Sequence, residues 1–215
     1  MFFNKKKYLP YGKHSINITD ILRVIKTLKS DFLTQGPLVP EFEKNISQKV
    51  YSNYAVAVNS ATSALHIACL ALNLKPEEYV WTSPISFVAS SNCALYCGAK
   101  IDFVDVDINT GLIDVNLLEK KLKKAAIEEK LPKILIPVHL AGTSCNMEEI
   151  YKLSKKYDFK IIEDASHALG AQYKKMPIGS CQFSDITVFS FHPVKMITTA
   201  EGGVATTNDK FLFEK

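Results

Sequence analysis

Tyr54-Ala55-Val56-Ala57-Val58 is followed by the polar turn Asn59-Ser60-Ala61-Thr62-Ser63 and then by an Ala- and Leu-rich segment that runs to about Leu74. The apolar run predicts a buried strand, the small and hydroxylic residues predict a turn, and the segment behind them predicts a helix. A strand that turns directly into a helix is the first half of a βαβ unit, in which the helix carries the chain to a parallel neighbour.

The same alternation continues on both sides of this unit. Further strands are predicted at 79–83, 101–105, 133–138, 160–163, 186–190 and 204–206. Helices are predicted at 18–30, 38–51, 87–97, 114–128 and 146–157. Short β-rich runs that alternate with helical segments indicate an α/β fold around a mostly parallel sheet.

Composition and length place the chain among ordinary globular domains. Its 215 residues suffice for one sizeable α/β domain, and a hydrophobic content of 47% with 22% charged residues is typical of such a domain. The net charge of +4 comes from local lysine clusters without interleaved aromatic residues, so nucleic acid is not expected as a partner. No apolar run reaches membrane-spanning length.

Cysteine usage and the first residues predict a cytoplasmic location. The five cysteines form no C-x-x-C pair and no zinc spacing, and the chain does not begin with a signal-peptide pattern. An odd number of cysteines without such a signal favours a reducing compartment. The five histidines likewise lack metal-ligand spacing, so no metal site is expected.

A single lysine, Lys195, lies in the run from Ser190 to Gly203, and the preceding lysine is Lys175. A lysine amine becomes nucleophilic toward an aldehyde where its site lowers the pKa. Lys195 is therefore a candidate Schiff-base lysine. Taken alone, the run fits a surface lysine on a loop equally well.

Asp164 directly follows the strand predicted at 160–163. Open α/β sheets bind ligands at the carboxyl ends of their parallel strands, and a carboxylate there can keep a pyridine nitrogen protonated, as pyridoxal phosphate requires. Alone, Asp164 also fits an N-cap or turn aspartate. Because Asp164 and Lys195 both lie where predicted strands end, each supports the functional interpretation of the other.

The turn at 59–63 is a candidate anion site, because backbone N–H groups at a helix N-terminus favour negative charge. When the turn is considered alone, helix capping by Ser60 or Thr62 is the simpler explanation of its polar residues. The chain has no G-x-G-x-x-G and no P-loop motif, so a dinucleotide site is not supported. Ser190 is a candidate second phosphate contact, and Phe87 is a candidate stacking aromatic, although a core position is favoured for a single phenylalanine.

Together, residues 59–66, 163–170 and 189–195, with Glu201-Gly202-Gly203, resemble the sugar-nucleotide aminotransferases of the DegT/DnrJ/EryC1/StrS family. The resemblance runs from about Tyr8 to the last residue. Within the family it is greatest to the 4-aminotransferases of pseudaminic acid synthesis, through residues 59–65, 83–89, 164–170 and 190–199. It implies the large domain of a type I pyridoxal-phosphate-dependent aminotransferase, with a mostly parallel mixed sheet flanked by helices.

The resemblance also implies roles for individual residues. Lys195 is expected to bond covalently to pyridoxal phosphate, Asp164 to pair with the pyridine nitrogen, and His167 to lie near the phenolic oxygen. The expected phosphate contacts and the expected stacking residue are Ala61, Thr62, Ser190 and Phe87. Contacts to the nucleotide-sugar are expected from Tyr11, Asp31, Phe32, Leu33 and Thr34, together with Ala61 and Ser190.

The implied reaction is transamination at C4 of a UDP-linked 4-keto-6-deoxy sugar, with L-glutamate as amino donor and a homodimer as the full-length form. A perosamine- or bacillosamine-type aminotransferase and a non-catalytic relative remain alternatives. A sugar 3-dehydratase is disfavoured, because those relatives carry histidine at the position of Lys195.

The chain is shorter than the family pattern. Residues 208–215 read as the start of a helix, so we expect the chain to comprise an N-terminal segment and most of the cofactor-binding large domain, and to lack the small C-terminal domain. An inactive fragment, or half of a split enzyme, is a further alternative.

Overall fold

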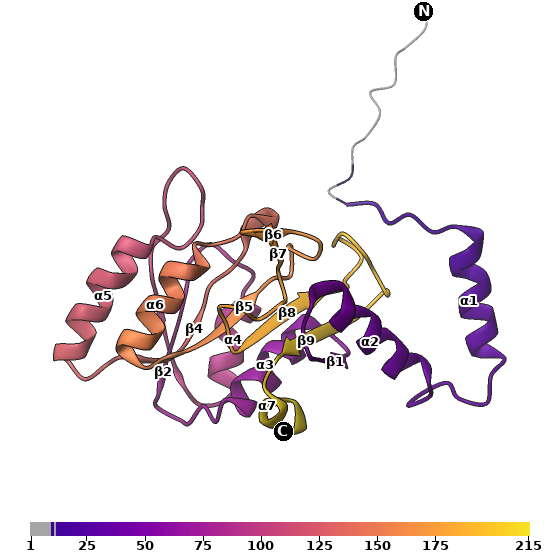
Figure 1. Cartoon of the computed structure of the whole chain (residues 1–215), viewed down its shortest axis with the longest axis horizontal. Coiled ribbons are helices and arrows are strands. Elements are labelled where there is room, and N and C mark those ends of the chain that lie inside the picture. The colour runs from indigo at the N-terminus through magenta and orange to yellow at the C-terminus, as the bar shows by residue number, and fades with distance from the viewer. Residues whose placement is uncertain (1–9, 11) are drawn as a thin grey trace, which may run out of the picture.

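A seven-stranded sheet forms the centre of the computed structural model, which describes residues 10 and 12–215. The strand order is β1-β9-β8-β5-β4-β2-β3, and helices cover both faces (Figure 1). The strands of this sheet are β1 (Tyr54–Val58), β2 (Tyr79–Thr82), β3 (Lys100–Phe103), β4 (Pro132–Ile136), β5 (Lys160–Asp164), β8 (Ile186–Ser190) and β9 (Gly203–Thr207).

The helices lie close to the predicted ranges. They are α1 (Ile18–Leu28), α2 (Leu38–Val50), α3 (Ala61–Ala71), α4 (Ala89–Tyr96), α5 (Val115–Ile127), α6 (Met147–Tyr157) and α7 (Lys210–Glu214). The sequence patterns did not predict the 3₁₀ turn η1 (Leu140–Gly142) or the two-stranded hairpin of β6 (Gln172–Tyr173) and β7 (Met176–Pro177). Strands of two residues are too short to show a periodic pattern.

The sheet is mixed but mostly parallel, as predicted. Strands β8, β5, β4, β2 and β3 pair in parallel, whereas β9 runs antiparallel to both of its neighbours, β8 and β1. A short connection without a crossover helix leads from β8 to β9, so the two strands must run in opposite directions.

Alternate residues of each strand face opposite helical layers. On β5, Ile162 packs in the cluster that contains residues of α3 and α4, whereas Ile161 packs in the cluster of α5 and α6. Helix α2 covers the remaining part of the second face, where Val50 packs with Phe189. Asp164 therefore lies on the α3/α4 side of the sheet, and Glu163 lies on the opposite side.

Helix α1 stands apart from the sheet (Figure 1), and none of its residues is buried. Asn17 caps it by accepting hydrogen bonds from the backbone N–H groups of Thr19 and Asp20. Among the described helices, none is both long enough and apolar enough to span a bilayer.

Candidate active site

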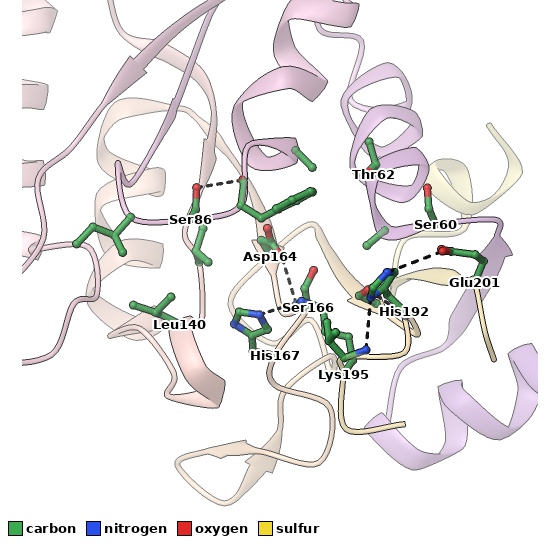
Figure 2. Close-up of a pocket in the computed structure, with 18 residues that line it drawn as sticks. Ser60, Thr62, Ser86, Leu140, Asp164, Ser166, His167, His192, Lys195 and Glu201 are labelled. Carbon is green, nitrogen blue, oxygen red and sulfur yellow. Dashed lines mark hydrogen bonds and ion pairs between the residues drawn. The ribbon is translucent and has the colours of Figure 1, made fainter. Parts of the chain in front are cut away.

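The strand ends predicted to carry the site meet around one cavity of about 530 Å³. All seven residues predicted to bind the cofactor line it, and Figure 2 shows Asp164, His167 and Lys195 around the same space. The full lining is Ser60, Ala61, Thr62, Ile85, Ser86, Phe87, Ala89, Val138, Leu140, Asp164, Ser166, His167, Ser190, His192, Val194, Lys195, Glu201 and Gly202.

The N-terminus of α3 forms one wall of the cavity. Ser60 is the N-cap residue, and its hydroxyl accepts a hydrogen bond from Ser63 N at 3.1 Å. Within the described residues, the N–H groups of Ala61 and Thr62 donate to no protein acceptor. Helix capping is therefore compatible with anion binding here, because the cap satisfies one N–H and leaves the first two groups of the helix free for a ligand.

Strand β9 brings Ser190 to this helix terminus. Gly203 pairs with Val58 at the end of β1 and with Ser190 at the end of β8, so it lies between the turn and the hydroxyl. A Cβ atom at position 203 would clash with Ser60 C and O and would lie 2.5 Å from Ala61 N. Only glycine therefore allows β9 to pass this close to the turn.

The carboxylate of Asp164 is buried and held on both oxygens. Ser90 Oγ donates to Oδ2 at 2.6 Å, and the Ser166 N–H donates to Oδ1 at 3.1 Å. The Asp164 backbone is also held on both sides, because its N–H donates to Pro137 O and its carbonyl accepts from His139 N. Asp164 is therefore a rigid acceptor on the floor of the cavity.

Lys195 lies beside His167, with Nζ 2.9 Å from Nε2. Burial lowers the pKa of Lys195 below its ordinary value, although Asp164 acts in the opposite direction. Burial and the nearby Lys195 charge likewise lower the pKa of His167. These shifts favour the neutral amine, which is the nucleophilic form.

The tautomer of His167 follows from its other nitrogen. The backbone N–H of Ala141 donates to Nδ1 at 3.3 Å, so the proton of the neutral ring lies on Nε2 and faces Lys195. A neutral amine at Lys195 can accept this hydrogen, whereas an ammonium group would face another donor. The hydrogen-bond geometry is therefore compatible with a neutral Lys195 amine that faces the Nε2–H of His167.

The position of Phe87 differs from the one favoured by the sequence. A core position was favoured for this side chain, but it is 70% exposed and lines the cavity from the segment between β2 and α4. An exposed aromatic ring at a cavity wall is available to stack on a planar ligand. The structure therefore contradicts the core interpretation and leaves the stacking role open to Phe87.

Residues 14–215 match the model of the DegT/DnrJ/EryC1/StrS aminotransferase family. The chain belongs to this family. It is 43% identical over 207 residues to the UDP-4-amino-4,6-dideoxy-N-acetyl-beta-L-altrosamine transaminase of Campylobacter jejuni, which covers 96% of this chain and 53% of that relative. The chain spans about half the length of the curated relatives it matches.

Solved structures of aminotransferases confirm the predicted fold class. The chain is similar to Helicobacter pylori PseC, an aminotransferase of pseudaminic acid biosynthesis, with a TM-score of 0.86 and 36% identity over 95% of this chain and 53% of that one. It is also similar to Spr1654 from Streptococcus pneumoniae in its PLP form, with a TM-score of 0.85 and 35% identity over 95% of this chain and 54% of that one.

Of the residues predicted to contact the nucleotide-sugar, Ala61 and Ser190 line the cavity, but the segment at 31–34 does not. Asp31, Phe32, Leu33 and Thr34 lie exposed in the link between α1 and α2, and none of them lines it. Tyr11 lies outside the described residues. Their role in substrate binding remains a prediction.

Several polar residues of the cavity were missed by sequence reasoning. Ser166 and Ser86 line it, and His192 and Glu201 form a pair at 3.9 Å across its rim. Ser90 reaches Asp164 from the first turn of α4. The signal that could have found Ser90 is its position, because the first turn of a helix that follows a parallel strand lies at the carboxyl edge of the sheet.

A second buried polar group lies behind Asp164, on the opposite face of β5. Glu163 accepts from His139 Nε2 at 2.7 Å, from Thr187 at 3.0 Å and from Ser184. The Cys145 N–H donates to His139 Nδ1, which places the ring hydrogen on Nε2, toward the carboxylate. Since His139 N also holds the Asp164 carbonyl, this cluster supports the strand end that carries the site.

Replacing Glu163 with Gln is expected to lower the free energy of unfolding by about 1–3 kcal/mol at neutral pH, because an amide cannot accept all three hydrogen bonds. Burial acts to raise the pKa of Glu163, but the hydrogen bonds from His139, Ser184 and Thr187 hold it below its ordinary value. Its stabilising contribution is therefore complete above the unfolded-state pKa and is lost as pH falls through the lower folded-state pKa.

The measurement is urea unfolding of both proteins between pH 3 and pH 7. The Glu163→Gln protein should be less stable at pH 7, and the difference should shrink below about pH 4.5. A difference that stays constant over this range would contradict the charged state assigned to Glu163.

Proposed function

We propose that the chain is the cofactor-binding part of a pyridoxal-phosphate-dependent aminotransferase that acts on a nucleotide-linked keto sugar. One observation carries the proposal: Lys195, Asp164 and the free N–H groups of Ala61 and Thr62 line the same cavity. This combination supplies an amine for an aldehyde, an anion for a pyridinium nitrogen and an anion site for a phosphate.

The residues fit each chemical group of pyridoxal phosphate. The N-terminus of α3, with Ser190, would hold the phosphate, and Phe87 would cover a ring face. Asp164 would accept a hydrogen bond from the ring nitrogen and stabilise its positive charge. When bound, the cofactor supplies an electron sink for the carbon that loses a proton.

The side chains of the chain itself account for the proton transfers. Lys195 has a lowered pKa, which suits it to take a proton from the amino donor and return it to the sugar carbon as general base and acid. His167 Nε2 lies 2.9 Å from Nζ, so its N–H would orient the neutral amine by donating to it. Asp164 stays in place because two donors and two backbone hydrogen bonds hold it.

We further infer the substrate class from the similar proteins. The Campylobacter jejuni relative is named for a UDP-linked 4-amino-4,6-dideoxy sugar, and the Helicobacter pylori protein is described as acting in pseudaminic acid biosynthesis. These names support amination at C4 of a UDP-linked 4-keto-6-deoxy sugar with L-glutamate as donor. Tyr11 and residues 31–34 are proposed to bind this sugar, and the whole protein is proposed to be a homodimer.

The experiment has two stages. The protein is first incubated with pyridoxal phosphate, reduced with borohydride, digested and mapped, and the label is expected on the peptide that contains Lys195. Amino transfer from glutamate is then measured with UDP-linked 4-keto sugars of the pseudaminic, bacillosamine and perosamine types. A label at another lysine would contradict the proposed site, and transfer to none of these sugars would contradict the substrate class.

A further inference from the structure

Ser90 lies at the start of α4 and has no exposed surface. Its hydroxyl donates to Asp164 Oδ2 at 2.6 Å, across 74 residues of sequence. Its backbone N–H donates to Phe87 O at 3.1 Å, which ties its position to the segment that lines the cavity. The hydroxyl thus reaches the carboxylate from the helical layer above the sheet.

The hydrogen bonds of Asp164 leave room for a further donor on each carboxylate oxygen. An ionised carboxylate has about four acceptor positions, and Ser90 and Ser166 N occupy one on each oxygen. The remaining positions can accept an N–H group of a ligand in the cavity that Asp164 lines. A buried carboxyl group without donors is costly, so the Ser90 hydroxyl also helps to hold Asp164 in place.

We propose that Ser90 is a positioning residue for the cofactor: it fixes the orientation of the Asp164 carboxylate so that this group accepts the ring N–H of pyridoxal phosphate. The proposal rests on the proposed function. Ser90 does not line the cavity, so it acts through Asp164. The turn that follows Asp164 supplies the other donor, Ser166 N, and the pair of donors holds both carboxylate oxygens.

The position of Ser90 explains why a short hydroxyl is needed. Ser90 itself is fully buried on α4, and its helix neighbours Ala89 and Cys93 are buried in the α3/α4 cluster. Alanine would fit this position but would leave Oδ2 without its closest donor. A loss of function without a loss of folding is therefore the expected consequence of Ser90→Ala.

The test compares two ligands, pyridoxal phosphate and its analogue with a CH group in place of the ring nitrogen. Binding of each is measured by fluorescence titration of the ligand-free protein. Ser90→Ala is expected to weaken binding of pyridoxal phosphate roughly 10- to 100-fold, as for loss of a hydrogen bond to a charged group. Its affinity for the analogue should stay within about twofold of the parent value, because that ligand does not use Asp164.

Ser91→Ala is the matched control. The Ser91 hydroxyl donates to the backbone carbonyl of Val88 at 2.9 Å on the exposed side of the same helix, so its removal should change neither affinity. Ser90→Cys keeps a weaker donor on a side chain of similar size and should bind pyridoxal phosphate with an affinity between those of Ser90→Ala and the parent protein. Circular dichroism and thermal unfolding of the ligand-free variants verify folding, and Ser90→Cys, a weak donor, replaces Ser90→Ala if that variant does not fold.

The outcomes separate this proposal from the proposed function. Equal binding of pyridoxal phosphate by Ser90→Ala and the parent protein would overturn the role of Ser90. If Ser90→Ala weakened the binding of both ligands equally, the role of Ser90 would also be overturned, because the effect would then be structural. If the parent protein bound neither ligand, or bound both equally, the proposed function of Asp164 would fail, and the role of Ser90 with it.

Discussion

Alanine at position 195 is expected to abolish covalent attachment of pyridoxal phosphate and to reduce amino transfer by about 10⁴-fold or more, because one amine serves both as nucleophile and as general base. Lys195 is the lysine that lines the cavity, and its lowered pKa favours the neutral amine. The visible absorbance of the loaded protein and borohydride labelling report the attachment directly.

The control for this prediction is Lys210→Ala, which removes an exposed lysine on α7. That variant should keep the absorbance and the label. The Lys195→Ala protein should still bind the cofactor without a covalent bond, because Asp164 and the N-terminus of α3 remain. An unchanged visible spectrum in Lys195→Ala would contradict the assignment of the cavity.

Alanine at position 203 is expected to lower the free energy of unfolding by about 1–3 kcal/mol and to weaken binding of pyridoxal phosphate roughly 10- to 100-fold. The added methyl group meets backbone atoms, Ser60 C and O and Ala61 N, which cannot rotate away. The turn at 59–63 must therefore shift away from β9, and the N–H groups of Ala61 and Thr62 shift with it. Chemical denaturation and cofactor titration measure the two effects.

The neighbouring glycine supplies a graded comparison. A Cβ atom at Gly202 meets the hydroxyl of Thr199, a side-chain atom that can rotate, so Gly202→Ala should destabilise the fold less than Gly203→Ala. Inorganic phosphate gives a further readout, because it competes for the α3 terminus without using Lys195 or Asp164. Undiminished phosphate binding by Gly203→Ala would contradict the location proposed for the phosphate.

The predictable part of the fold follows from local patterns. The apolar runs at 54–58, 79–83, 160–163 and 186–190 each form a strand of the central sheet. Alternation of these runs with helical segments predicted the parallel sheet. Parallel strands run in the same direction, so their carboxyl ends lie at the same edge of the sheet. Convergence of Asp164 and the turn at Ala61 is therefore a consequence of topology.

Other features depend on contacts between distant segments. Whether Phe87 points into the core or toward the cavity depends on the path of the chain between β2 and α4. The sequence favoured the core, and this prediction was wrong. The partners of Glu163 come from two segments, His139 after β4 and Ser184 with Thr187 at the start of β8, and no local sequence pattern links either segment to Glu163. The link at 31–34 lies outside the cavity because α1 stands apart from the sheet.

The sequence by itself determined the order and type of the main elements, the family, and the seven expected cofactor contacts that line the cavity, since periodicity and turn chemistry act over a few neighbouring residues. The tertiary structure alone decided that Ser90 holds Asp164 and that Gly203 lets β9 pass the turn at Ser60. These contacts depend on strand register and helix packing, which join residues far apart in the chain and leave no local pattern.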